Sequence, residues 1–144
     1  MKINKQKLKQ SSKKAFKGFV GVLPIIFAML LLVSMINNLV PKSFYSKVFS
    51  GNTISDSVVG ALLGSILTGN PISAYILGNG FLKNGVSLIA VTAFLTAWTT
   101  VGIIQLPAET MVLGRKFAIY RNISAFAISI LTAIITAYIV GLLS

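Results

Sequence analysis

The sequence predicts an all-α, polytopic membrane protein, and three observations support this prediction. Hydrophobic residues make up 55% of the 144 residues and charged residues only 10%, whereas a soluble domain has about 25% charged residues. Apolar runs of about 18 or more residues recur along the chain, long enough to cross a bilayer as helices. Inside a bilayer the backbone amides must be paired within the spanning segment, which favours helices over other structures.

The first element is a basic arm followed by an apolar helix. Residues 1–18 form the arm, and the predicted span over residues 19–40 ends at Pro41. The arm contains seven of the thirteen Lys and Arg residues, and the net charge of the chain is +11. A basic arm beside a span sets the membrane topology and contacts anionic lipid. Nucleic-acid binding is not expected, because no aromatic residues alternate with these lysines.

The second apolar stretch, residues 54–82, is predicted to be a broken helix. Gly69 permits a helix C-cap, Asn70 is a favourable N-cap and Pro71 suits the first position of a new helix. Each half has about 11 to 14 residues, which at 1.5 Å per residue reaches the bilayer midplane and no further. The stretch is therefore either a re-entrant hairpin or one interrupted crossing.

The distribution of positive charge distinguishes these two arrangements, because cytoplasmic loops carry an excess of Lys and Arg. A single crossing of residues 54–82 places eight of the thirteen cations inside and five outside. A re-entrant hairpin places ten cations inside and three outside. The hairpin is therefore favoured, with the N-terminus inside and the C-terminus outside.

Two more apolar segments complete the membrane domain. Residues 86–106 are predicted to span, with Pro107 at their end and a polar, β-branched interruption within residues 97–102. An amphipathic connector over residues 108–120 leads to the last predicted span, residues 122–143. Small hydroxyl residues along the last span allow close helix packing. They are Ser124, Ser129, Thr132 and Thr136.

The predicted fold is thus three transmembrane helices plus a re-entrant broken-helix hairpin, or four spans if the hairpin crosses. Residues 19–144 form a single membrane domain behind the arm of residues 1–18. Within the hairpin, Gly60 and Gly64 form a G-x-x-x-G motif, which indicates close helix packing rather than chemistry.

The residue inventory excludes most catalytic chemistry. Cysteine and histidine are absent, which removes disulfides, thiolate metal sites and imidazole bases. The two carboxylates, Asp56 and Glu109, lie far apart in sequence and do not suggest an acid–base pair. We expect no enzyme activity, no metal site and no cofactor. Glu109 is expected near Arg115 in a structural role, with proton coupling as the alternative.

The break in the hairpin is the candidate site for a solute. Half-helices that meet inside a membrane are tolerated where they are buried in protein or line a wet cavity. The second half begins with a positive dipole end and unpaired amides, which suit an anionic or oxygen-rich group. The candidate substrate-binding residues combine this break with polar positions of the third element. They are Thr68, Gly69, Asn70, Pro71, Ser73, Trp98, Thr99, Thr100 and Gln105.

Each of these residues also has a structural interpretation. The Gly69–Pro71 segment could be a turn between two interfacial helices. Thr99 and Thr100 could bond to carbonyl oxygens of their own helix, as Ser and Thr in membrane helices commonly do. Trp98 could contribute bulk packing only.

Four motifs in a fixed order resemble the prokaryotic predicted-permease family, which includes ArsP-like and YraQ-like permeases. They are residues 67–73 (LTGNPIS), 80–87 (GFLKNGVS), 93–100 (AFLTAWTT) and 105–109 (QLPAE). The resemblance covers about residues 54 to 143. It implies a multi-pass permease of the cytoplasmic membrane with the broken helix in its transport core. Many members carry cysteines before the proline, so thiol-dependent handling of arsenicals is not expected of a chain with Thr68, Gly69 and Asn70 there.

The resemblance also implies how such a chain works. Full-length members carry two related halves, so this chain is expected to act as a half-length permease unit in a dimer. The partner is a sister protein or a second copy, and the cargo is a small solute or ion moved by alternating access. Sodium coupling and facilitated diffusion are both open. The alternatives are a non-transporting scaffold or regulatory subunit, a pore, or half of a gate-type nucleoside or ferrous-iron permease.

Overall fold

The computed structural model describes residues 5–67 and 69–143. All regular structure in these residues is α-helical, as predicted. Two of the helices contain segments long and apolar enough to cross a membrane, residues 9–36 and 115–143. The helices are α1 (Lys5–Leu39), α2 (Lys42–Val48), α3 (Thr53–Ile66), α4 (Pro71–Lys83), α5 (Leu88–Thr100), α6 (Leu106–Leu113) and α7 (Arg115–Leu143).

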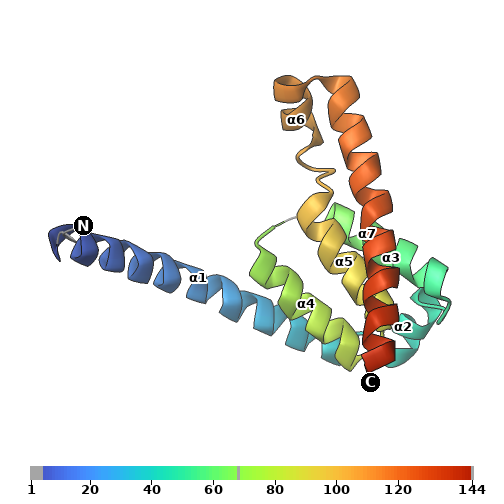
Figure 1. Ribbon diagram of the computed structural model, residues 1–144. Coiled ribbons are helices and arrows are strands. Elements are labelled where there is room, and N and C mark those ends of the chain that lie inside the picture. Colours follow the sequence, from blue (N-terminus) through green and yellow to red (C-terminus); the bar gives the residue numbers. More distant parts are fainter. Residues whose placement is uncertain (1–4, 68, 144) are drawn as a thin grey trace.

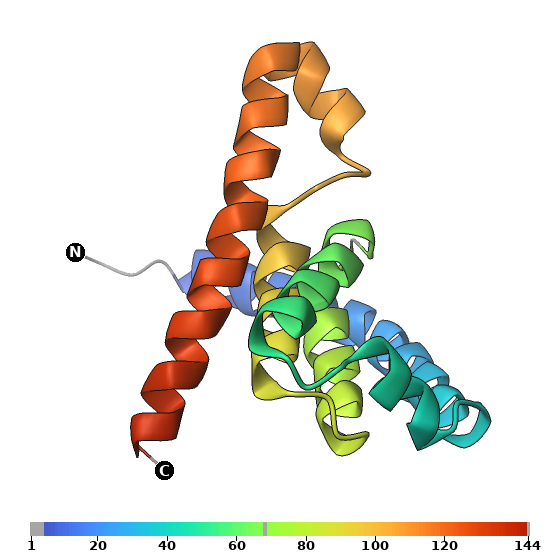
Figure 2. The same ribbon diagram turned by 90° about the vertical axis from the view of Figure 1, so that its right-hand side faces the viewer.

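Helix α1 extends away from the other helices, as Figures 1 and 2 show. It includes most of the basic arm, and it continues through Pro24 without ending. Only its C-terminal part packs on the bundle, where Met29 and Val33 contact the cluster around Phe94. The rest of α1 exposes large apolar side chains, among them Phe19, Phe27 and Leu31. Such a surface is covered by lipid or by another protein.

Helices α3 and α4 form an antiparallel hairpin beside α5. A Cβ atom on Gly60 would overlap the carbonyl oxygen of Ala90, and one on Gly64 would overlap that of Phe94, so α3 and α5 run in the same direction. Gly78 of α4 lies beside Val91, whereas the hairpin tip lies beside Trp98, so α4 runs the opposite way. The prediction that the G-x-x-x-G motif serves close packing is confirmed.

The two ends of the bundle are chemically distinct. At one end, which we call the base, the loop before α3 meets the loop between α4 and α5, and Asp56 lies between them. At the other end, the tip end, the Gly69 segment meets the C-terminus of α5. Residues 54–82 therefore begin and end at the base, and the middle of this segment lies at the tip end.

The third predicted element is shorter than expected. Helix α5 ends at Thr100, within the predicted interruption, and residues 101–105 are not helical. The predicted connector then divides into α6 and the first turns of α7, joined at Gly114 with a φ of 84°, which favours glycine. Helix α7 returns from the tip end to the base (Figure 1).

The packing between α3, α5 and α7 depends on small side chains. Ala61, Ala93, Ala97 and Ala133 are fully or almost fully buried in one cluster. Of the hydroxyl residues predicted to aid packing on the last span, only Ser129 is buried. Small residues allow the backbones to approach closely, and they place the short helix α5 directly against both α3 and α7.

Candidate functional site

A cavity of about 210 Å³ lies at the tip end of the bundle. It forms where the hairpin tip, the break after α5 and the start of α7 come together. Six of the nine predicted site residues line it, and Val101, Gly102, Glu109 and Arg121 complete the lining. The six are Gly69, Pro71, Trp98, Thr99, Thr100 and Gln105.

Trp98 joins the two interruptions of the chain. Its indole N–H donates to the carbonyl oxygen of Gly69 at 3.3 Å. The ring packs edge-on against Phe94, with ring centroids 5.4 Å apart, and only 8% of the residue is exposed. A buried Trp needs a partner for its N–H, and the unpaired carbonyl of a broken helix supplies one. Trp98 is therefore both a packing residue and part of the cavity wall.

Asn70 caps α4 and does not line the cavity. Its side-chain oxygen accepts the Ile72 amide at 2.9 Å, and its carbonyl oxygen accepts the Ser73 amide at 2.9 Å. Pro71 has no N–H to offer. The expectation of unpaired amides at this tip is therefore wrong, because Asn70 and Pro71 together leave none in the first three positions of α4. These amides are therefore not available to a ligand.

The other predicted residues divide between the cavity and its surroundings. Thr99 and Thr100 are exposed to the cavity, and their hydroxyls donate to the carbonyl oxygens of α5, including that of Thr96 at 3.0 and 2.7 Å. Because a hydroxyl that donates one hydrogen bond can still accept others, both threonines remain possible acceptors in the cavity wall. Ser73 is buried beneath the tip and does not line the cavity. Thr68 lies outside the described residues.

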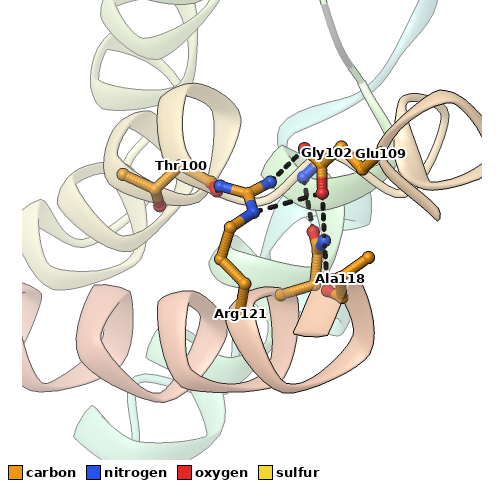
Figure 3. Close-up of polar contacts among 6 residues, drawn as sticks. Thr100, Gly102, Glu109, Ala118 and Arg121 are labelled. Atoms are coloured by element: carbon orange, nitrogen blue, oxygen red, sulfur yellow. Dashed lines mark hydrogen bonds and ion pairs between the residues drawn. The ribbon is translucent and has the colours of Figure 1, made fainter. Parts of the chain in front are cut away.

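Two residues of the cavity wall, Glu109 and Arg121, form an ion pair, which Figure 3 shows. Arg121 donates from Nε to Glu109 at 3.1 Å, and its Nη2 makes a second, shorter contact with the same carboxylate. Asn122 donates to Glu109 at 2.9 Å and accepts the Gly102 amide at 2.9 Å. The hydrogen bond from Arg121, helped by that from Asn122, holds the pKa of Glu109 below its usual range.

This polar cluster was only partly predicted. Glu109 was expected near Arg115, but its partner is Arg121, twelve residues along the chain on the far side of the Gly114 turn. Asn122 is 8% exposed, and at the start of an apolar run it was counted as part of the span. The only signal in the sequence was the position of this polar amide at the start of an otherwise apolar run.

The cavity wall therefore offers hydrogen bonds of both kinds. Threonine oxygens and Glu109 accept, while Arg121 and the Gln105 amide donate. The charges of Glu109 and Arg121 cancel, so the wall is neutral overall. No group of three or more His, Cys, Asp or Glu side chains occurs in the described part of the chain. The arrangement can bind a small polar molecule by hydrogen bonds.

Comparison with known proteins identifies the family. A family model described as a predicted permease, ArsP_1, matches residues 17–141, which include the four motifs and all residues that line the tip cavity. No curated protein and no solved structure shows a significant match. Because the match covers most of the chain, the family resemblance of the four motifs is confirmed. The chain belongs to the ArsP_1 family of predicted permeases.

Proposed function

We propose that this chain is a solute-conducting permease unit and that the solute binds in the cavity at the tip end. One observation supports this proposal above the others: the cavity lies where two helix interruptions meet, the Gly69–Pro71 tip and residues 101–105. Interrupted helices at membrane depth are tolerated where they are buried in protein or line a wet cavity, and secondary transporters use them to form the substrate site. Family membership supports a permease-like transporter rather than an enzyme.

The cavity wall selects the solute class. Since Glu109 neutralises Arg121, hydrogen bonding rather than net charge would distinguish solutes. A volume of about 210 Å³ accommodates a molecule of a few heavy atoms. A small, polar, oxygen-rich solute that is uncharged or zwitterionic fits this wall. An anion would have to compete with Glu109 for Arg121.

The membrane arrangement follows from helix lengths. Helices α1 and α7 cross the bilayer, and the α3–α4 pair enters and leaves on the base side. Helix α5 has 13 residues, about 20 Å at 1.5 Å per residue, so residues 101–105 would complete its crossing. Large apolar side chains cover the outer faces of α1 and α7. A second unit packed there would enclose the path and allow access to alternate between the two sides.

A blocking experiment tests the proposal, because the chain has no cysteine. Purified Thr99→Cys protein in liposomes is tested by osmotic swelling with a panel of glycerol, urea, betaine and acetate. At least one solute should enter, with saturation, and a charged thiol reagent should stop this entry until dithiothreitol restores it. The matched control is Met111→Cys on the exposed face of α6, outside the cavity wall, where modification should leave entry unchanged.

Three results would contradict the proposal. Entry that continues after complete modification of Thr99→Cys would place the path elsewhere. Entry that never saturates would indicate a pore rather than a carrier. If every solute of the panel, together with phosphate and sulfate, fails to enter while the protein remains folded, the chain is a scaffold or regulatory subunit.

A further inference from the structure

A second polar site lies at the base, at the opposite end of α5 from the tip cavity. Asp56 is 1% exposed, although it is a carboxylate. Its Oδ1 accepts the Ser50 amide at 2.8 Å and the Ser50 hydroxyl at 3.5 Å, and its Oδ2 accepts the Ser87 hydroxyl at 3.2 Å. In all three hydrogen bonds Asp56 is the acceptor, which is the pattern of an ionised carboxylate.

No positively charged side chain of the described residues forms an ion pair with Asp56. Within the described residues, the only ion pair is the one between Glu109 and Arg121 at the tip end. An ionised carboxylate removed from water costs several kcal/mol unless a charge offsets it. Asp56 lies in the first turns of α3, and Ser87 caps α5, so two helix dipoles offset part of this cost. The dipoles supply partial charges only, and a full positive charge is still missing.

The space for that charge lies next to the carboxylate. A cavity of about 240 Å³ has Asp56 in its wall, together with oxygen atoms from both base loops and from α2. Burial raises the pKa of Tyr45, so this wall residue stays a neutral phenol at physiological pH. The oxygen-bearing side chains around the cavity are Tyr45, Ser46, Ser50, Asp56, Asn84 and Ser87.

We propose that Asp56 and the hydroxyl oxygens of Ser50 and Ser87 bind a sodium ion in this base cavity. One carboxylate among neutral oxygens matches one positive charge. A divalent ion would leave an excess positive charge in a buried place, where such a charge is costly. An intramembrane or buried carboxylate that lacks a cationic partner is expected to serve ion binding or coupling.

The location of the site gives it a role in the proposed transport, and this part of the inference rests on the proposed function. Ser87 caps the first turn of α5 by accepting the Ala90 amide, and Trp98 and Thr100 end the same helix in the tip cavity. Small residues hold α3 against α5 along its length. An ion that draws Ser87 toward Asp56 would shift α5 at both cavities, which would couple sodium binding to solute binding.

Sodium binding can be measured without knowing the solute. Purified wild-type protein is heated in sodium chloride, potassium chloride or choline chloride at equal ionic strength. The unfolding temperature should be several degrees higher in sodium, because a ligand that binds the folded state stabilises it. Asp56→Asn, which keeps the shape and an acceptor oxygen, should lose this sodium-specific difference. Glu109→Gln should retain it.

A second measurement is independent of unfolding. Binding of radioactive sodium ions to the purified protein should saturate in the wild type and disappear in Asp56→Asn. In Ser87→Ala, half-saturation should need about tenfold more sodium, because the loss of one oxygen ligand weakens the binding free energy by about 1.4 kcal/mol. Equal unfolding temperatures in the three salts, with no saturable sodium binding, would overturn the inference. So would sodium binding that persists in Asp56→Asn. Neither result would depend on whether the tip cavity transports a solute.

Discussion

The indole N–H of Trp98 donates a hydrogen bond to the carbonyl oxygen of Gly69 at 3.3 Å. The bond joins the last turn of α5 to the tip of the α3–α4 hairpin, across 29 residues of sequence. Gly69 lies in the break between α3 and α4, where no helix supplies a partner for its carbonyl oxygen, and Trp98 lies in the last turn of α5, just before the interruption of residues 101–105. The connection therefore fixes the tip cavity at the place where the two interruptions would otherwise be free to separate.

Replacing this connection should destabilise the fold measurably. Trp98→Phe removes the N–H and part of the ring, and the loss should be about 1 to 3 kcal/mol from one hydrogen bond and buried apolar area. Circular dichroism during thermal unfolding in detergent measures the change. Tyr138→Phe, at an exposed position of α7, is the control and should be neutral. An unchanged unfolding temperature in Trp98→Phe would mean that the connection contributes nothing.

The contact between α3 and α5 should be the most sensitive to added volume. A Cβ on Gly64 would overlap the Phe94 carbonyl oxygen and lie 3.0 Å from the Trp98 amide nitrogen. Because both are backbone atoms, the helices must separate, and Gly64→Ala should cost about 1 to 3 kcal/mol or more. Gly141→Ala, with no atom within 4 Å, should be neutral or slightly stabilising. Folded yield and unfolding temperature measure both variants.

Asn70 should act through the stability of α4 and not through solute binding. Asn70→Ala removes the cap on the Ile72 amide and should cost about 1 kcal/mol. Asn70→Ser and Asn70→Asp can still cap and should recover most of this loss, with normal solute entry in liposomes. Loss of entry in Asn70→Ser, in a protein of normal stability, would instead place Asn70 in the binding site.

Local patterns predicted much of the fold, because helix signals act over a few residues. The Gly69–Pro71 break, the Asn70 cap and the close packing at Gly60 and Gly64 all follow from residue types in adjacent positions. The same local rules did not show that Asn70 would satisfy the amides of its own helix. The solute site was expected at the hairpin tip together with polar positions between Trp98 and Gln105. The polar groups that α6 and α7 add to the cavity, Glu109 and Arg121, were not predicted.

Contacts between distant residues were the part that could not be predicted. Glu109 reaches Arg121 because Gly114 reverses the chain, and no periodicity within one helix relates the two. Asp56 accepts from Ser87 across 31 residues because α3 and α5 lie parallel with their N-termini together. From the sequence, Asp56 was given no partner, and Glu109 was expected near Arg115. Each gains its partners only from the tertiary arrangement.

The Glu109–Arg121 pair gives the protein a defined dependence on pH. Since the pKa of Glu109 is lowered in the folded state, the pair stabilises the fold above the ordinary glutamate pKa. This stabilisation is lost as the pH falls through the lowered folded-state value. Wild type should thus exceed Glu109→Gln in unfolding temperature at pH 7, and the gap should shrink below about pH 4.

A control separates this effect from general acid denaturation. Arg115→Gln removes a positive charge that does not contact Glu109 in the described structure. The difference in unfolding temperature between this variant and wild type should therefore not shrink between pH 7 and pH 3 as the Glu109→Gln difference does. A gap between wild type and Glu109→Gln that stays constant from pH 7 to pH 3 would contradict an ionised, stabilising Glu109.

The membrane arrangement can be mapped with single cysteines in this cysteine-free chain. Ser46 and Lys83 are exposed and lie near the base, whereas Arg115 begins α7 at the tip end (Figure 1). In intact cells, an impermeant thiol reagent should label cysteines at Ser46 and Lys83 and leave one at Arg115 unmodified. In inverted membrane vesicles the pattern should reverse. Since α7 returns to the base, a cysteine at Leu142 should label with the first pair.

This result would fix the orientation of the whole unit. Helices α3 and α4 would then enter and leave the membrane on the same side, which leaves α1, α5 and α7 as the three crossings. With three crossings, the N-terminus and the C-terminus lie on opposite sides of the membrane. A related second unit would then have to insert upside down to form the internal symmetry common in secondary transporters. Labelling of Arg115 together with Ser46, and protection of Lys83, would mean that residues 54–82 cross the membrane once and that no inverted partner is required.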